Sequence, residues 1–278
     1  MRLQRDPEGE EFSRWLLDVG HGQNSDERGK VLIPADMLVQ DAASLIDFVY
    51  PGIDSPEPPP PDYFLNQMIL APRNADVSDI NDTILDCMAG ETHTFYSANE
   101  VIHEDGADGP DDIPLTPEFL RSINASNLPP GELHIKKGCP LILLRNISPS
   151  QGLCNGTRVI VTNVGWHVLE VRIISGDHDG QVAFIPRISI TTTSSSGYAF
   201  KIRCRQYPVR LAFALTINKD QGQSVKFVGL DLRTPVFSHG QLYVALSRAT
   251  SQAHVKVLLP DNSASWTTNV VYPEALVD

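Results

Sequence analysis

The sequence lacks the features that mark membrane-spanning and secreted proteins. Its 278 residues contain no apolar run approaching the roughly 18 residues of a transmembrane helix, so we predict no membrane segment and no membrane partner. The N-terminal stretch, MRLQRDPEGEEF, is charged from its start and is not a signal peptide. We therefore expect an intracellular protein.

Cysteine is also scarce, and no two cysteines form a C-x-x-C pair. The eight histidines are equally scattered, so the chain offers none of the ligand spacings that are typical of zinc sites. We predict no metal site and expect reduced thiols. The four cysteines are Cys87, Cys139, Cys154 and Cys204.

A phosphate-binding loop is missing from the sequence as well. An NTPase motor requires G-x-x-x-x-G-K-[ST] and an acidic partner for magnesium, and neither is present. The nearest glycine pairs, Gly20 with Gly22 and Gly152 with Gly156, are not followed by Lys and Ser or Thr. The part of a motor that binds most of a nucleotide is thus absent from this sequence.

Positive charge is sparse, but it is unevenly distributed. Residues 1–130 contain 7 Lys and Arg against 25 Asp and Glu, a net charge of −18, whereas residues 131–278 carry +6. Such a difference between halves is informative about partners, although a net charge of −12 argues against nucleic acid. The densest cationic stretch is Lys201–Arg205, which is also compatible with a merely solvated strand face.

Strand and helix patterns alternate at both ends of the chain. The spacing of Phe12, Trp15, Leu16 and Val19 predicts an amphipathic helix, and we predict a second helix over 34–50. A buried strand over 68–72 is followed by Asp76, a candidate N-cap for the next helix. Further predicted elements are strands over 209–215, 225–230 and 254–259 and a helix over 237–248.

Short β-rich runs fill the middle of the chain. Residues 140–145, 157–163, 168–174 and 182–190 are punctuated by Gly, Asn, Asp and Pro at hairpin-like spacing. We predict a small all-β module over 131–205, inserted between α/β units that share one parallel sheet. A stand-alone β-barrel with α/β decoration fits less well, because the α/β motifs are too complete.

Two polar clusters, each after an apolar run, carry a family resemblance. FALTINKDQGQSV and HGQLYVALSRATS resemble motifs V and VI of Pif-one-type, RecD-like superfamily 1 DNA helicases, in the versions carried by Helitron transposons. MRLQRDPEGEEFSRWLLDVGHG resembles the opening of their second motor domain, and MILAPRNADVSDIND resembles the next motif. LPPGELHIKKGCPLILLRNISPSQGLCNGTRVIV resembles their SH3-like 2B insertion, and TTNVVYPEAL their C-terminal end.

The resemblance implies an α/β fold and a division of the chain. Residues 1–130 and 206–278 would form the second RecA-like motor domain of a helicase pair, and 131–205 the inserted SH3-like all-β module of 2B type. The family unwinds DNA in the 5′-to-3′ direction with ATP and Mg²⁺, and we expect a nuclear location. Neither ATP nor Mg²⁺ is expected to bind tightly to this chain alone, because its partner, the N-terminal RecA-like domain, is missing. Genome maintenance, telomere work and transposon replication all remain open as processes.

The resemblance also assigns roles at a nucleotide site. Arg248 matches the arginine finger, which stabilises charge on the γ-phosphate, and Arg2 matches a second γ-phosphate sensor. Gln241, Tyr243 and Gly222 would line the nucleotide cleft. Without the family, Arg248 would more often be a surface residue that complements a helix dipole, and Gln241 and Tyr243 would be packing residues.

Other residues are expected to contact single-stranded DNA through its phosphates. They follow strand ends or lie on the expected basic face of the insertion, and their alternative roles are capped turns and charged, soluble strand edges. They are Thr216, Asn218, Lys219, Gln221, Arg73, Asn74, Lys136, Lys137, Arg145 and Asn155, with Asn146 and Arg158 on the same face. Asp220 departs from the family pattern and adds a negative charge among them. A non-catalytic remnant or interaction protein is therefore the rival hypothesis.

Overall fold

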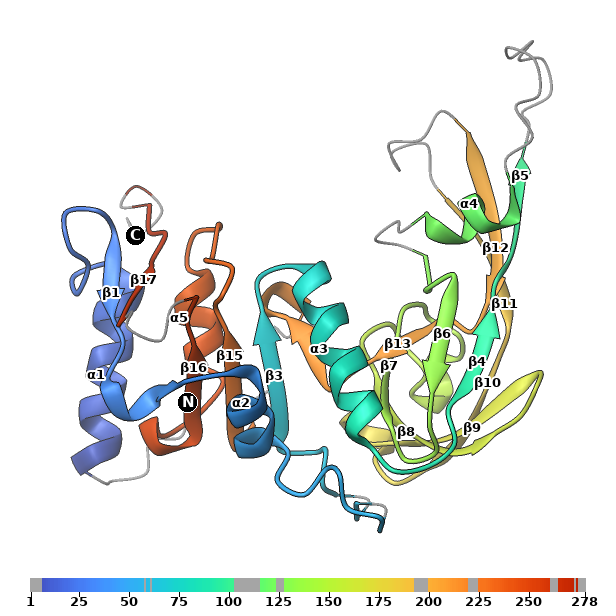
Figure 1. The fold of residues 1–278 in the computed structure, drawn as a ribbon, viewed down its shortest axis with the longest axis horizontal. Helices are drawn as coiled ribbons and strands as arrows, with labels where there is room; N and C mark the ends of the chain where they lie inside the picture. The colour runs from blue at the N-terminus through green and yellow to red at the C-terminus, as the bar shows by residue number, and fades with distance from the viewer. Residues whose placement is uncertain are drawn as a thin grey trace. The chain divides into compact units, whose positions relative to one another are not determined.

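The computed structural model describes residues 7–57, 59–60, 62–102, 116–123, 128–192, 200–219, 225–260, 265–272 and 274 (Figure 1). The chain divides into two compact units. Unit 1 comprises Met1–Ala89 and Phe213–Asp278, and unit 2 comprises Gly90–Ala212.

Unit 1 is built on a five-stranded parallel sheet of order β14-β3-β15-β16-β2. The central strands are buried almost throughout, as expected for a parallel sheet covered on both faces. Its strands are β2 (Leu38–Val39), β3 (Gln67–Ala71), β14 (Ala214–Thr216), β15 (Phe227–Asp231) and β16 (Val255–Leu258).

Helices and a small ribbon complete unit 1. Phe12, Leu16 and Val19 are buried on the first helix, which confirms the predicted amphipathic pattern. The helices are α1 (Pro7–His21), α2 (Ala42–Val49), α3 (Asn74–Cys87) and α5 (Gln241–Leu246), with 3-10 turns η1 (Ala35–Met37), η4 (Ile217–Lys219) and η5 (Gln252–His254). Strands β1 (Lys30–Leu32) and β17 (Trp266–Thr268) pair antiparallel. None of the helices in the described ranges combines the length and the hydrophobicity that a membrane span requires.

A glycine in β15 allows α2 to lie close against the sheet. A Cβ at Gly229 would lie 2.8 Å from Val49 Cγ2 and 3.1 Å from Leu45 Cδ1, both on α2. Real Cβ atoms essentially never make contacts as short as 2.8 Å, so a larger residue at Gly229 would force Val49 or its surroundings to shift. Tyr50, just after α2, donates its hydroxyl to the carbonyl of Phe213 at 2.5 Å, which fixes the chain where it re-enters unit 1.

Helix α3 completes the hydrogen bonding of the edge strand β14. The buried Asn81 side chain donates to the Ala214 carbonyl at 3.1 Å and accepts from the Ala214 amide at 2.9 Å. Because Ala214 pairs with β3 on its other side, the Asn81 amide acts as a substitute neighbouring strand. One side chain therefore satisfies two backbone groups that would otherwise be buried without partners.

Three sequence predictions in unit 1 are wrong in detail. The predicted helix over 34–50 begins only at Ala42, since Leu38–Val39 pair with β16, a contact that local periodicity cannot reveal. Asp41 caps it by accepting from the Ser44 amide at 2.7 Å. Asp76 is not an N-cap, because α3 already begins at Asn74, and the helix predicted over 237–248 is shorter, with α5 covering Gln241–Leu246.

Unit 2 is almost entirely antiparallel β-structure. A five-stranded sheet of order β10-β9-β8-β7-β13 lies beside a three-stranded sheet, β11-β12-β5, and the pair β4-β6. The predicted β-runs are confirmed. The elements are β4 (His93–Tyr96), β5 (Ala98–Ile102), α4 (Pro117–Ser122), β6 (Glu132–Ile135), β7 (Pro140–Leu143), η2 (Pro149–Gln151), β8 (Arg158–Val164), β9 (Val168–Ile173), η3 (Gly176–His178), β10 (Val182–Pro186), β11 (Ile188–Thr191), β12 (Lys201–Gln206) and β13 (Val209–Leu211).

The compact units differ in extent from the expected domains. Unit 2 begins at Gly90 rather than at residue 131, because β4 pairs with β6 and β5 pairs with β12. The strand predicted over 209–215 is two strands. β13 pairs with β7 of unit 2, and β14 pairs with β3 of unit 1.

Candidate nucleic-acid and nucleotide interfaces

Three neighbouring strands of unit 1 bring polar residues to one edge of the sheet. β14, β3 and β15 are parallel and end at Thr216, Ala71 and Asp231, so their carboxyl ends share that edge. Ligands of open α/β sheets bind at this edge. The arrangement follows from topology, since β3 lies between β14 and β15 although it is far from both in sequence.

The predicted DNA-binding residues after β14 lie at this edge as far as they are described. Thr216 closes β14 and is buried, whereas Asn218 in η4 is exposed. Lys219 ends η4, and the structure describes its backbone but not its side chain. Gln221 and Gly222, like the departing Asp220, lie outside the described residues.

Arg73 and Asn74 reach the same edge from β3. Both side chains are exposed at the start of α3, two and three residues beyond the end of β3 at Ala71. The structure therefore brings together two predicted DNA-binding segments that are over 140 positions apart in the printed sequence. Their roles stay predictions.

An ion pair that the sequence reading missed lies at the end of β15. The Arg233 guanidinium binds both carboxylate oxygens of Asp231, with Nη2 to Oδ2 at 2.7 Å and Nε to Oδ1 at 3.0 Å. This hydrogen bonding raises the pKa of Arg233, and the nearby Asp76 and Asp79 act in the same direction. In the sequence, an aspartate and an arginine two residues apart at the end of a predicted strand could have indicated this pair. With three carboxylates around one cation, this end of the edge is acidic.

The predicted arginine finger, Arg248, lies two residues beyond the end of helix α5, which packs against η4. Arg248 is half-buried, and its Nε donates to the Val244 carbonyl at 3.0 Å, so the guanidinium lies back along its own helix. Its backbone carbonyl accepts from the Val225 amide at 3.1 Å. η4 packs against α5. Both ends of the segment from Ile217 to Val225 are therefore attached to the helix region that bears Arg248.

The other predicted nucleotide residues differ in accessibility. Gln241 is 2% exposed, and its Oε1 accepts from the amides of Phe237 at 3.0 Å and Ser238 at 3.4 Å. It thus holds the turn before α5 together, which matches its alternative role in packing. Arg2 lies outside the described residues.

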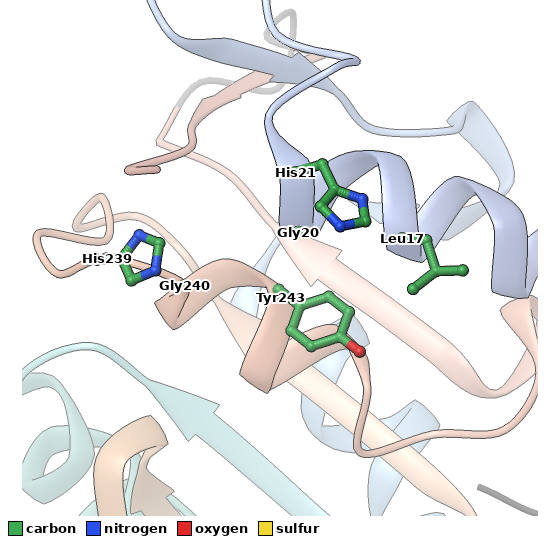
Figure 2. A pocket seen from close by; sticks show the side chains of 6 residues that line it. All are labelled: Leu17, Gly20, His21, His239, Gly240 and Tyr243. Carbon is green, nitrogen blue, oxygen red and sulfur yellow. The ribbon is translucent and has the colours of Figure 1, made fainter. Parts of the chain in front are cut away.

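Tyr243 lines a pocket of about 240 Å³ between α1 and α5 (Figure 2). Leu17, Gly20 and His21 of α1 form one side, and His239 and Gly240 lie on the other. A larger residue at Gly20 would crowd the ring of Tyr243, because a Cβ would lie 3.0 Å from Tyr243 Cδ2. The sequence reading missed both histidines, although Gly20-His21-Gly22 was noticeable as a glycine pair.

The expected basic face of unit 2 is smaller than predicted. Lys136 and Arg158 are 6% and 3% exposed, so neither lies on an open face. Lys137, Asn146 and Asn155 are exposed and Arg145 is half-buried. The backbone amide of Asn155 donates to Asn146 Oδ1 at 2.8 Å, so these two residues are joined by a hydrogen bond.

Comparison with known proteins connects this architecture to one family. Residues 118–164 match the model of the 2B domain of DNA helicase Pif1. The ATP-dependent DNA helicase PIF1 of Mus musculus is 32% identical over 192 residues, which are 68% of this chain and 26% of that protein. The Homo sapiens protein of the same name is 30% identical over 192 residues, with the same coverage of 68% and 26%. The chain thus spans about a quarter of the length of these relatives.

Solved structures agree at the level of the fold. Pif1 helicase from Candida albicans has a TM-score of 0.57 at 23% identity, covering 95% of this chain and 56% of that one. Pif1 helicase from Bacteroides, in complex with ADP-AlF3 and ssDNA, has a TM-score of 0.57 at 21% identity, covering 98% and 52%. The expected fold, a RecA-like parallel sheet with a 2B-type β-module, is confirmed, as is the resemblance on which it rested.

Proposed function

We propose that this chain, which is similar to part of Pif1-type superfamily 1 DNA helicases, acts as the second RecA-like domain of such an enzyme together with its 2B module. It binds single-stranded DNA at the carboxyl edge of the unit 1 sheet and contributes Arg248 to an ATP site. One observation carries the proposal most directly. The segment from Thr216 to Val225 leaves the DNA-facing edge and ends in a hydrogen bond to Arg248.

The DNA-binding step uses the polar groups along this edge. The amides of Asn218 and Asn74, the guanidinium of Arg73 and the ammonium of Lys219 are donors that bond phosphate oxygens irrespective of base sequence. Such contacts release counterions, so the affinity falls steeply as salt rises. Asp76 and Asp79 lie close to Arg233, so their carboxylates oppose phosphate binding near the end of β15.

The nucleotide step requires Arg248 to change partners. Its Nε now donates to Val244, and the same group must turn outward to reach a γ-phosphate. An arginine finger accelerates hydrolysis by roughly 10³–10⁵. The phosphate-binding loop comes from a separate RecA-like domain, since the printed sequence contains none. Hydrolysis of ATP, with Mg²⁺ as the cofactor, supplies the energy for 5′-to-3′ unwinding in the complete enzyme. No three His, Cys, Asp or Glu side chains gather as metal ligands within the described ranges.

Titration of a labelled oligo-dT with the purified chain tests the DNA-binding step. We expect binding at 50 mM salt that weakens about sevenfold at 200 mM, because the two cations each contribute about 0.7 to the salt slope on single-stranded DNA. Lys219→Ala should weaken it about tenfold or less and lower the salt slope by about 0.7. Arg28→Ala, at an exposed cation away from the edge, is the matched control. Robust ATPase activity of the chain alone would contradict the division of the nucleotide site.

A non-catalytic interaction protein that retains the helicase fold is the second candidate. Asp220 favours it, because a carboxylate beside Lys219 opposes phosphate binding. An absence of oligo-dT binding at low salt, restored by Asp220→Ser, would support this candidate over the first.

A further inference from the structure

The three-stranded sheet of unit 2 presents a row of cations on its outer face. In β12 the side chains alternate, so that Ile202 and Cys204 are buried while Lys201, Arg203 and Arg205 face outward. Ile190 and Leu128 pack with Cys204 on the buried side. The cationic face is therefore fixed by the core beneath it, and a slip of one residue would bury three charges.

The side chains opposite Arg203 and Arg205 are small or polar, whereas Ile102 lies opposite Lys201. β12 is the central strand, between β11 and β5 (Figure 1). Ser189 and Ala98 lie opposite Arg205, while Thr191 and Glu100 lie opposite Arg203. Ser189, Thr191 and Ala98 are exposed and short, so the long cationic side chains rise above their neighbours. The hydroxyls add donors that suit phosphate oxygens.

The spacing of the row suits a nucleic-acid backbone. Alternate residues of a strand are about 6.6 Å apart, so the row from Lys201 to Arg205 spans about 13 Å. A DNA duplex presents a phosphate about every 3.4 Å along the axis on each strand. None of the outward residues on these three strands is aromatic, so the face offers no platform for unstacked bases. A rigid, stacked duplex fits it better than a single strand.

We propose that the outer face of β5, β11 and β12 binds the phosphate backbone of double-stranded DNA. The inference rests on the proposed function only because both take DNA as the ligand. It assigns a second DNA-binding surface, which lies on unit 2. Arg203 and Arg205 are the principal contacts, and Lys201 lies on the same face. Glu100 opposes binding, because its carboxylate holds Arg203 at 2.6 Å with both side chains about half exposed, 59% and 50%. A surface pair of this kind is weak, so a phosphate can replace Glu100.

Fluorescence anisotropy with a labelled 20-base-pair duplex of mixed sequence tests the proposal. We expect the double variant Arg203→Gln/Arg205→Gln to bind about tenfold or more weakly at 0.1 M salt, with a salt slope lower by about 2. Glu100→Gln should bind more tightly than the unaltered chain. The matched control is Arg28→Gln/Lys30→Gln, which removes two exposed cations from unit 1. Thermal melting of each variant checks its fold.

Two results would overturn the inference. One is no duplex binding by the unaltered chain at 50 mM salt. The other is equal duplex affinity for the double variant and its control. The oligo-dT assay separates this from the proposed function. If the double variant Arg203→Gln/Arg205→Gln loses duplex binding while its affinity for oligo-dT changes less than twofold, the result supports the duplex-binding face on unit 2. If Lys219→Ala leaves oligo-dT binding unchanged and the chain still binds the duplex, the result supports the duplex-binding face on unit 2. The same result contradicts the proposed single-strand site at the edge of the unit 1 sheet.

Discussion

The Asn81 amide makes a sharp test of how the edge strand β14 is held. In Asn81→Leu a side chain of similar size replaces the amide, and the Ala214 amide and carbonyl both lose their partner. Ala214 is 0% exposed and Asn81 only 4%, so water cannot easily replace the lost bonds. The strand then has one bonded edge instead of two.

The expected loss follows from these two hydrogen bonds. Each contributes about 1 kcal/mol net, and a buried backbone group left unpaired costs about 1–3 kcal/mol, while the leucine recovers part of this through apolar burial. We expect the free energy of unfolding of unit 1 to fall by about 2–4 kcal/mol. Asn81→Asp should be at least as harmful, because it keeps an acceptor for the Ala214 amide but sets a carboxylate oxygen against the Ala214 carbonyl.

Urea unfolding followed by circular dichroism measures the global effect, and hydrogen exchange of a peptide covering Ala214 measures the local one. Ser78→Ala, at an exposed position of the same helix, is the control and should change stability by less than about 0.5 kcal/mol. If Asn81→Leu lost less than about 1 kcal/mol and Ala214 exchanged no faster, the amide would not be holding the strand.

Three further predictions follow from the packing. Gly229→Ala should destabilise unit 1 by about 1–3 kcal/mol, since its Cβ overlaps Val49, and an unchanged melting temperature would contradict this. Burial raises the pKa of the Cys139 thiol to about 12 and that of Cys204 to about 11. At pH 8, iodoacetamide should therefore label the exposed Cys87 first and these two only after unfolding, as peptide mass mapping will show. The folded-state pKa values of these two thiols lie above the unfolded value of 9.0. Their contribution to stability is therefore complete below pH 9.0 and is lost between about pH 9 and 12. We expect Cys139→Ala to make the urea midpoint depend less on pH across that range.

Local sequence patterns were sufficient for elements whose burial is periodic. The spacing of Phe12, Leu16 and Val19 predicted α1, and the solvated strand face that was the alternative for Lys201–Arg205 is found in β12. They failed where long-range pairing decides. Leu38–Val39 is a strand only because β16 lies beside it, and the run over 209–215 divides because its two ends pair in different units.

The candidate site was predictable to a similar degree. Residues that follow strands, such as Thr216 and Arg73, could be expected at one edge once the sheet was assumed parallel. The contacts that these side chains make within the fold could not be predicted from the sequence. Gln241 turns inward to hold a loop, and Lys136 and Arg158 are buried, although polar and charged residues are usually exposed.

The hydrogen bond from the Val225 amide to the Arg248 carbonyl has a thermodynamic consequence. It joins the end of the segment proposed to bind DNA to the residue proposed for the nucleotide, so we expect a ligand bound at one of them to change the free energy of binding at the other. Linkage is reciprocal, so the factor by which ATP alters DNA affinity in the complete enzyme must equal the factor by which DNA alters ATP affinity. Replacing Val225 with proline removes the amide hydrogen and should bring both factors toward one together.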